Sequence, residues 1–168
     1  VYKRQILVNS KEGLTFVLVN KDSEGLEIKQ TSSLDQTRPM CEINMKDILI
    51  SDDEIMIGSH SCINTWEKVK NISLGYLAME QVGGAQACLD MSTQYAKERI
   101  QFGRPIGSFQ AIQHICANML VQLESAKSVA YSAVRTDTSD DLEVEMSAML
   151  AKSYCSEVFN KIAGDNIQ

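Results

Sequence analysis

The first third of the chain holds two short apolar runs, residues 6–9 and 14–19, followed by two stretches, 26–30 and 41–50, in which apolar and polar residues alternate; along the rest of the chain apolar residues recur at helical spacing. A period of two is typical of half-buried strands, whereas spacings of three and four residues are typical of amphipathic helices. The runs that predict strands are residues 6–9, 14–19, 26–30 and 41–50. Polar turns join the first three runs, and a polar loop, residues 31–39, precedes the last. These connections are too short for helical crossovers, so we expect antiparallel pairing.

Three long helices are predicted after a polar connector that spans residues 51–63. Asn64, with Glu67 three residues on, has the form of a capping box and predicts the start of a helix that reaches Arg99. Apolar stripes predict two more helices, Phe109 to about Thr136 and Leu142 to at least Ile162, with a polar turn at residues 136–141.

These elements predict an α+β fold: a partial antiparallel β-domain followed by three long antiparallel helices of an incomplete four-helix bundle. Three amphipathic helices of this length leave a seam where a fourth would pack. That seam, together with the absence of an initiator Met, favours a piece of a longer protein. Val1–Gln5 spell the translation of a transposon end used in sequencing libraries. We expect those five residues to be a library scar and leave them out of the fold prediction.

Composition excludes several classes of function. The net charge is −6 and no basic stripe is present, which argues against nucleic acid as a partner. No run reaches the ~18 apolar residues of a membrane span. No charged leader with an apolar centre precedes the first strand, so the sequence predicts a cytoplasmic, bacterial protein.

The cysteines and histidines do not form a metal-binding pattern. Five cysteines are scattered without a C-x-x-C motif, which is typical of reduced thiols in an intracellular protein. His60 has no partner at metal-ligand spacing, and we expect a surface residue. His114 and Cys116, two residues apart on a helix, point to different faces and cannot chelate one ion.

The stretch from Tyr95 to Gln113 holds the strongest candidate for a site. Lys97 and Arg99 fall in the last turn of the first helix, where cations offset the negative dipole end. Gly103, Pro105 and Gly107 interrupt helix, and Ser108 is a good N-cap for the second helix. From the residues alone, Arg99 is either a helix cap or a ligand for an anion held between two helix ends.

A longer motif in this stretch resembles the signature of the acyl-CoA dehydrogenase family: Arg99-x-x-Phe102-Gly103-x-Pro105-Ile106-x-x-Phe109-Gln110. The resemblance continues through residues 83–90 and 116–119 and covers all but the first five residues. It implies that residues 6–60 are part of the family's middle β-domain and that residues 61–168 are its C-terminal helical bundle, truncated.

The resemblance also implies a chemistry and partners. The family binds FAD and carries out α,β-dehydrogenation of acyl-CoA thioesters, with electron-transfer flavoprotein as the acceptor. Arg99, Phe102 and Gln110 match positions that reach the pyrophosphate and adenosine of a neighbouring subunit's FAD, and Gln168 matches the first residue of a Gln-x-x-Gly-Gly element. FAD shared across an interface implies a homo-oligomer, dimer or tetramer, or a hetero-oligomer.

The chain departs from the family where the catalytic base is concerned. The usual glutamate would follow Gln168, and the position of an alternative base is Ser73, beside Leu74 where an arginine is usual. No catalytic residue is therefore assigned. An acyl-CoA oxidase or flavin monooxygenase of the same fold, or a non-catalytic subunit that completes a partner's FAD site, are the alternatives.

Overall fold

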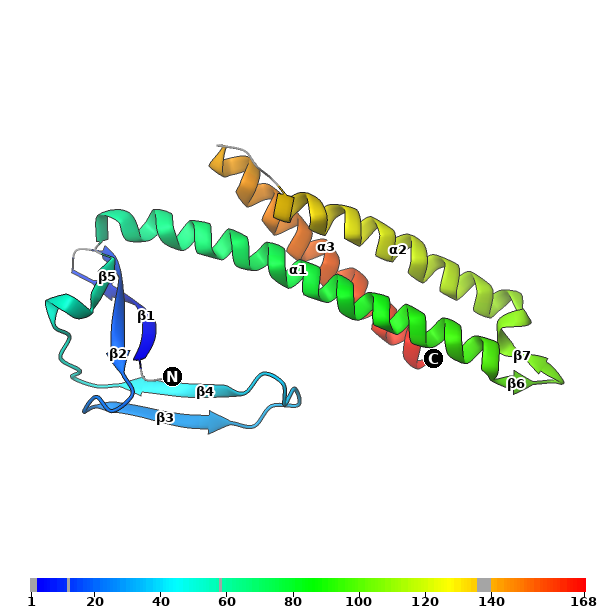
Figure 1. Ribbon diagram of the computed structural model, residues 1–168, viewed down its shortest axis with the longest axis horizontal. Helices are drawn as coiled ribbons and strands as arrows, with labels where there is room; N and C mark the ends of the chain where they lie inside the picture. Colours follow the sequence, from blue (N-terminus) through cyan, green and yellow to red (C-terminus); the bar gives the residue numbers. More distant parts are fainter. Residues whose placement is uncertain (1–2, 12, 58, 136–139) are drawn as a thin grey trace. The chain divides into compact units, whose positions relative to one another are not determined.

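A computed structural model of the chain describes residues 3–11, 13–57, 59–135 and 140–168. It divides into two compact units, Val1–Trp66 and Glu67–Gln168, with the division inside the first helix (Figure 1). Small antiparallel sheets make up most of the first unit and long helices the second, which is the predicted fold class.

The first unit holds two antiparallel sheets. In one, strands β1 (Lys3–Ser10), β2 (Gly13–Asn20) and β5 (Ile55–Ile57) lie in the order β1-β2-β5. In the other, β3 (Leu26–Thr31) pairs with β4 (Met40–Met45). The described residues of the suspected library scar, 3–5, pair with residues 18–20 of β2, and their origin stays a prediction.

The alternation at residues 26–30 and 41–50 predicted half-buried strands, and this prediction is wrong, because β3 and β4 are almost entirely exposed. Burial alternates instead on β2, which the sequence showed as an apolar run. Thr15, Val17 and Val19 are buried, and the residues between them are partly exposed. The predicted strand at residues 41–50 is too long, because β4 ends at Met45. Asp47 adopts a left-handed conformation (φ 52°), which a strand cannot continue through.

The prediction of a plain connector at residues 51–63 is wrong, and so is the helix start at Asn64. A one-turn 3₁₀ helix, Asp52–Glu54, precedes β5, and the long helix α1 already begins at Ser59. The structure forms a capping box at Ser51 instead. The N–H and Oγ of Ser51 both donate to Glu54 Oε2, at 3.2 and 3.0 Å. Asn64 has the same spacing to Glu67, but inside a helix its side chain has no terminus to cap.

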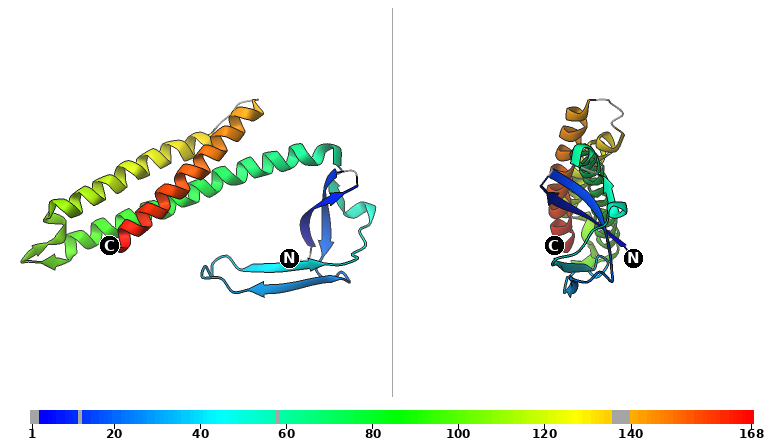
Figure 2. Two further views of the ribbon diagram at one scale, coloured as in Figure 1. Left: turned by 180° about the vertical axis from the view of Figure 1, so that it is seen from behind. Right: turned by 90° about the vertical axis from the view of Figure 1, so that its left-hand side faces the viewer.

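The second unit is built from three helices: the remainder of α1 (Ser59–Glu98), α2 (Gln110–Arg135) and α3 (Asp141–Ile167) (Figures 1 and 2). Asp140 caps α3 by accepting hydrogen bonds from the N–H groups of Leu142 and Glu143. Within the described part of the chain, no helix combines the length and apolar character needed to cross a membrane.

Helices α1 and α3 run parallel with a constant offset in sequence. Among the described residues, three hydrogen-bonded pairs join them along their length, Lys70–Glu145, Gln81–Ser156 and Ser92–Asn166, with separations of 75, 75 and 74 residues. A constant separation means that both helices advance in the same direction at the same rate. The connecting helix α2 therefore runs antiparallel to both.

The core of this unit mixes small and large side chains from all three helices. Five alanines are buried in it, and Met119, Leu123 and Ile162 are the large side chains that are fully buried. The alanines are Ala78, Ala85, Ala126, Ala130 and Ala151. Alanine at a contact lets helix axes approach closely, and each fully buried large side chain contributes about 1.5–3 kcal/mol.

Gly83 and Gly84 form a matched pair of positions on α1. A Cβ at Gly84 would lie 2.8 Å from two ring atoms of Phe159 on α3, whereas a Cβ at Gly83 meets nothing within 4 Å. Gly83→Ala should stabilise the protein by about 0.5–1 kcal/mol through helix propensity. Gly84→Ala should be about 1–3 kcal/mol less stable than Gly83→Ala because it overpacks Phe159. Urea denaturation compares the two, and equal stabilities would contradict the packing of the Phe159 ring against Gly84.

All five cysteines are free, and they differ in reactivity according to burial. Cys155 is buried, its Sγ donates to Ala126 O at 3.5 Å, and burial raises the pKa of its thiol above the ordinary 9.0. Since only the thiolate alkylates, iodoacetamide at pH 8 should modify exposed Cys41 at least about tenfold faster than Cys155. The pKa of Cys155 is higher in the folded protein than in the unfolded chain, so the protonated thiol favours folding. This contribution to stability is complete below pH 9 and is lost as the pH rises toward the pKa of the folded protein. Equal labelling rates in the folded protein, measured by peptide mass spectrometry, would contradict this environment.

Candidate functional site

The join between α1 and α2 is a small hairpin rather than an irregular link. Helix α1 ends at Glu98, and the N–H of Arg99 still donates to Tyr95 O at 2.8 Å. Two short strands follow, β6 (Ile100–Gln101) and β7 (Arg104–Pro105) (Figure 1). The sequence predicted a break in the helix here but not the strand pairing.

The tip of this hairpin is strained. Phe102 and Gly103 both have positive φ, 54° and 78°, as a two-residue turn with left-handed central residues requires. Glycine adopts such angles freely, but a bulky residue does so at a cost of order 1–3 kcal/mol. The Phe102 ring is also 91% exposed, so an aromatic side chain is held in solvent in an unfavourable backbone conformation.

Two contacts fix the hairpin to the end of α1. The N–H of Ile106 donates to Arg99 O at 2.8 Å and closes the loop. Gly107 then packs directly on α1, since a Cβ there would lie 2.9 Å from Ala96 O. The Nε2 of Gln113, in the first turn of α2, donates to Gly107 O at 2.9 Å. Helix end, hairpin and helix start thus form one connected structure.

The predicted N-cap role of Ser108 is wrong. Ser108 belongs to a 3₁₀ turn, Ile106–Ser108, and its Oγ donates to Pro105 O at 2.7 Å. Helix α2 begins two residues later, with the N–H groups of Ile112 and Gln113 donating to Phe109 O. The chain uses the serine to tighten the turn before the helix, so the first N–H groups of α2 lack a serine cap.

Arg99 and Gln110 lie exposed on either side of the hairpin. Among the residues that the structure describes, the guanidinium of Arg99 has no hydrogen-bond or ion-pair partner. It follows the C-terminus of α1 directly, and Gln110 opens α2, where the positive end of the helix dipole favours an anion. Backbone contacts therefore place a free guanidinium and a helix N-terminus on one short segment.

Gln168 is brought to the same end of the helical unit by the parallel register. Ser92 Oγ donates to Asn166 Oδ1 at 2.6 Å, which puts the last turn of α3 beside the last turns of α1. Gln168 follows two residues later and is exposed. No direct contact joins it to Arg99, Phe102 or Gln110 within the described parts.

Arg104 was not singled out from the sequence. Its guanidinium carbon lies 4.1 Å from the centroid of the Phe109 ring, within the range of a cation–π contact. The Phe109 ring in turn meets Phe102 edge to face, with centroids 6.1 Å apart and planes at 82°. The order Phe, Arg, Phe along the chain gives no periodic signal, because only the turn brings the three together.

The position noted for an alternative base offers no titratable group. Ser73 Oγ donates to Val69 O at 2.7 Å, a bond within the helix. Leu74 lines a shallow groove of about 320 Å³ between α1 and α3, together with Met149, Lys152, Ser153 and Ser156. No group of three or more possible metal ligands occurs in the described residues. His114 is exposed, and the side chain of His60 lies outside the described part.

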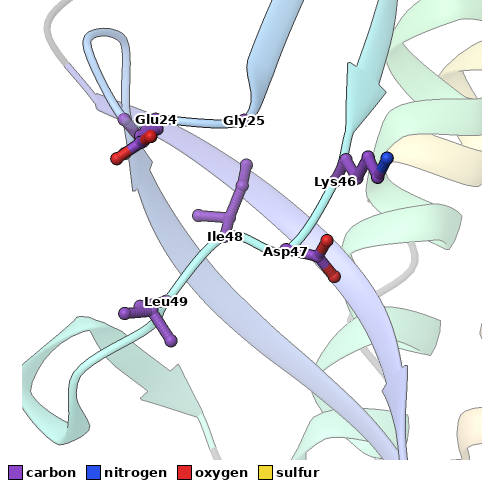
Figure 3. A pocket seen from close by; sticks show the side chains of 7 residues that line it. Glu24, Gly25, Lys46, Asp47, Ile48 and Leu49 are labelled. Carbon is purple, nitrogen blue, oxygen red and sulfur yellow. The ribbon is translucent and has the colours of Figure 1, made fainter.

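A second, larger cleft of about 540 Å³ lies in the sheet-containing unit (Figure 3). The turn after β2 contributes Glu24 and Gly25, and the segment after β4 contributes residues 46–49. Gly25 is required there, because its φ is 87° and a Cβ would lie 2.0 Å from Lys46 O. The cleft therefore lies where two backbone segments touch, and its charged lining residues are Glu24, Lys46 and Asp47.

Comparison with known proteins matches residues 74–168 to the family model described as "Acyl-CoA dehydrogenase, C-terminal domain". The acyl-CoA dehydrogenase IpdE2 of Mycolicibacterium smegmatis is 40% identical over 92 residues, 55% of this chain and 28% of the relative. The short/branched chain specific acyl-CoA dehydrogenase of Rattus norvegicus mitochondria is 31% identical over 150 residues, 87% of this chain and 34% of the relative.

A third relative, the caffeyl-CoA reductase–Etf complex subunit CarC of Acetobacterium woodii, is 29% identical over 176 residues, 100% of this chain and 45% of the relative. Among solved structures, butyryl-CoA dehydrogenase from Megasphaera elsdenii shares the fold (TM-score 0.85, 20% identity, 99% of this chain and 44% of that one). So does PigA, solved with FAD and proline (TM-score 0.88, 24% identity, 100% and 45%). The chain thus spans less than half the length of these proteins.

Gly107 allows a direct test of how the hairpin is held. Gly107→Ala would place a Cβ 2.9 Å from Ala96 O and 3.3 Å from Ala96 C, both backbone atoms that cannot move without bending α1. We expect a loss of about 1–3 kcal/mol in the free energy of unfolding. Gly164→Ala on α3, where a Cβ meets nothing within 4 Å, is the control. If both variants unfold at the same urea concentration, Gly107 does not pack on α1 as described.

Proposed function

The chain belongs to the acyl-CoA dehydrogenase family, and we propose that it is the FAD-contacting, C-terminal part of an oxidoreductase that removes hydrogens from adjacent carbons of an acyl-CoA thioester. Family membership supports a flavoprotein oxidoreductase in general terms. The activity of the whole protein, its substrate and its cofactor are proposals, because the chain spans only part of its relatives.

The observation that carries this proposal is the unpaired guanidinium of Arg99. A cation that is exposed and without a partner among the described residues, on the same short segment as the N-terminus of α2, suits a diphosphate. A guanidinium binds phosphate oxygens through two parallel N–H bonds. Arg99 and Gln110 would thus hold the pyrophosphate of FAD.

Phe102 and Gln168 suit other parts of the same FAD molecule. Phe102 offers an exposed aromatic face at a strained turn, which suits contact with the adenosine part of FAD. Gln168, at the same end of the helical unit, has an amide that can donate and accept. When bound, FAD would supply the two-electron acceptor for the acyl chain.

No residue of the described chain is proposed as the catalytic base. Ser73 is not a carboxylate, and its hydroxyl is already bonded to Val69 O. We therefore assign binding and orientation to this part of the protein and leave the proton abstraction to residues elsewhere in the active protein.

Oligomer and electron acceptor follow from the same proposal. A hairpin that projects from the end of the helices suits a ligand held mainly by another subunit, in a homo-oligomer (dimer or tetramer) or a hetero-oligomer. Electron-transfer flavoprotein is the proposed acceptor, supported by the relative whose name places it in a complex with Etf. An assay of acyl-CoA oxidation with electron-transfer flavoprotein as the acceptor separates the alternatives. An acyl-CoA oxidase or a flavin monooxygenase would use a different acceptor, and a non-catalytic subunit would give no turnover.

Arg99 variants test the diphosphate contact. In the full-length protein, because hydrogen bonds to charged groups contribute about 1.5–3 kcal/mol, Arg99→Ala should weaken FAD retention about ten- to a hundredfold. Arg99→Lys should recover only part of this, since an ammonium lacks the planar fork. The measurement is flavin absorbance per protein after dilution and gel filtration, beside thermal stability.

Lys97→Ala is the matched control, because Lys97 is the cation in the last turn of α1 and should affect stability alone. Full flavin occupancy in Arg99→Ala, with a lowered melting temperature like that of Lys97→Ala, would make Arg99 a helix cap and contradict the proposal.

A further inference from the structure

We propose that Arg104 is a positioning residue of the hairpin: stacked on Phe109, it holds Phe102 in the strained, exposed conformation that presents its ring to the nucleotide. This inference rests on the proposed FAD contact. It concerns a residue outside the set Arg99, Phe102, Gln110 and Gln168, and it is drawn from the geometry of the turn.

The first argument is the backbone of Phe102. With φ at 54°, it occupies the position where two-residue turns favour Asn or Asp, whose short side chains tolerate left-handed angles. Its ring is 91% exposed, so burial in the chain does not repay the strain. Some other interaction must favour this conformation over a relaxed hairpin.

The Phe109 ring supplies that interaction, and it is itself held in place. Phe109 lies at the start of α2, where its carbonyl accepts the first two N–H bonds of the helix, so its backbone is fixed. Its ring takes the edge-to-face contact from Phe102 at 6.1 Å, and Arg104 lies over it at 4.1 Å. Arg104 thus limits the rotation of the ring on which Phe102 rests.

Arg104 has no competing partner. In the described parts of the chain, no carboxylate lies within 4 Å of its guanidinium, and no hydrogen bond to its side chain occurs. A surface arginine without an anionic partner usually extends into water, whereas this one folds back over a ring from the adjacent turn. Guanidinium stacks on aromatic faces more readily than ammonium, because it is planar and weakly hydrated.

Hydrogen exchange and flavin retention together test the inference. In purified protein without flavin, Arg104→Ala should speed amide exchange in the hairpin, Ile106 included, by about two- to fivefold, the effect of losing an exposed cation–π contact. With FAD added, the same variant should lose flavin on dilution by a similar factor. Arg104→Lys should give exchange rates and flavin losses between those of Arg104→Ala and those of the unmutated protein.

A double-mutant cycle with Phe109→Leu separates positioning from simple charge. If Arg104 acts through the ring, Arg104→Ala should add no further effect once Phe109 is leucine. Arg135→Ala, an exposed arginine in the last turn of α2, removes the same charge and should change neither measurement.

Three results would overturn the inference: unchanged exchange and retention in Arg104→Ala, faster exchange with full retention, or an undiminished effect in the Phe109→Leu background. If the unmutated protein retains no FAD, the proposed function is overturned instead. The exchange rates of the flavin-free variants would then decide the role of Arg104 by themselves.

Discussion

The packing of three helices around small buried residues is the constraint on which the helical unit depends. Helices α2 and α3 approach closely, whereas α1 packs on α3 through side chains, with the Phe159 ring on Gly84 and three hydrogen-bonded pairs along the helix. These pairs keep one offset in sequence, which defines the register of α3 along α1. The last turn of α3 is thereby held beside the end of α1 that leads into the hairpin.

The hairpin follows from that packing and from a second close contact. Gly107 lies on the backbone of Ala96, which leaves too little space for a gradual exit from α1 and makes the chain reverse within two residues. The reversal costs strain at Phe102, and aromatic contacts with Phe109 offset part of it. Such strain is tolerated where the surrounding structure holds it, and it is common at ligand sites.

The proposed binding site uses groups that the hairpin segment presents to solvent. It offers a guanidinium unpaired among the described residues, the first N–H groups of a helix and an exposed aromatic residue. The chain covers less than half the length of its relatives, so the chemistry of the whole protein remains part of the proposal.

The sequence by itself determined the order of sheets before helices: an apolar, β-branched run predicted β2, and helical spacing of apolar residues predicted the three long helices. It did not determine the burial of β3 and β4, whose alternating residues stay exposed. The motif from Arg99 to Gln110 likewise identified the candidate site, because its residue types and spacing are local. The start of α1 and the roles of Asn64 and Ser108 depended on the tertiary structure, since a capping pattern has meaning only at a helix end. Arg104 and Phe109 became partners only through the turn, because stacking requires two side chains to meet in space and leaves no period in the sequence.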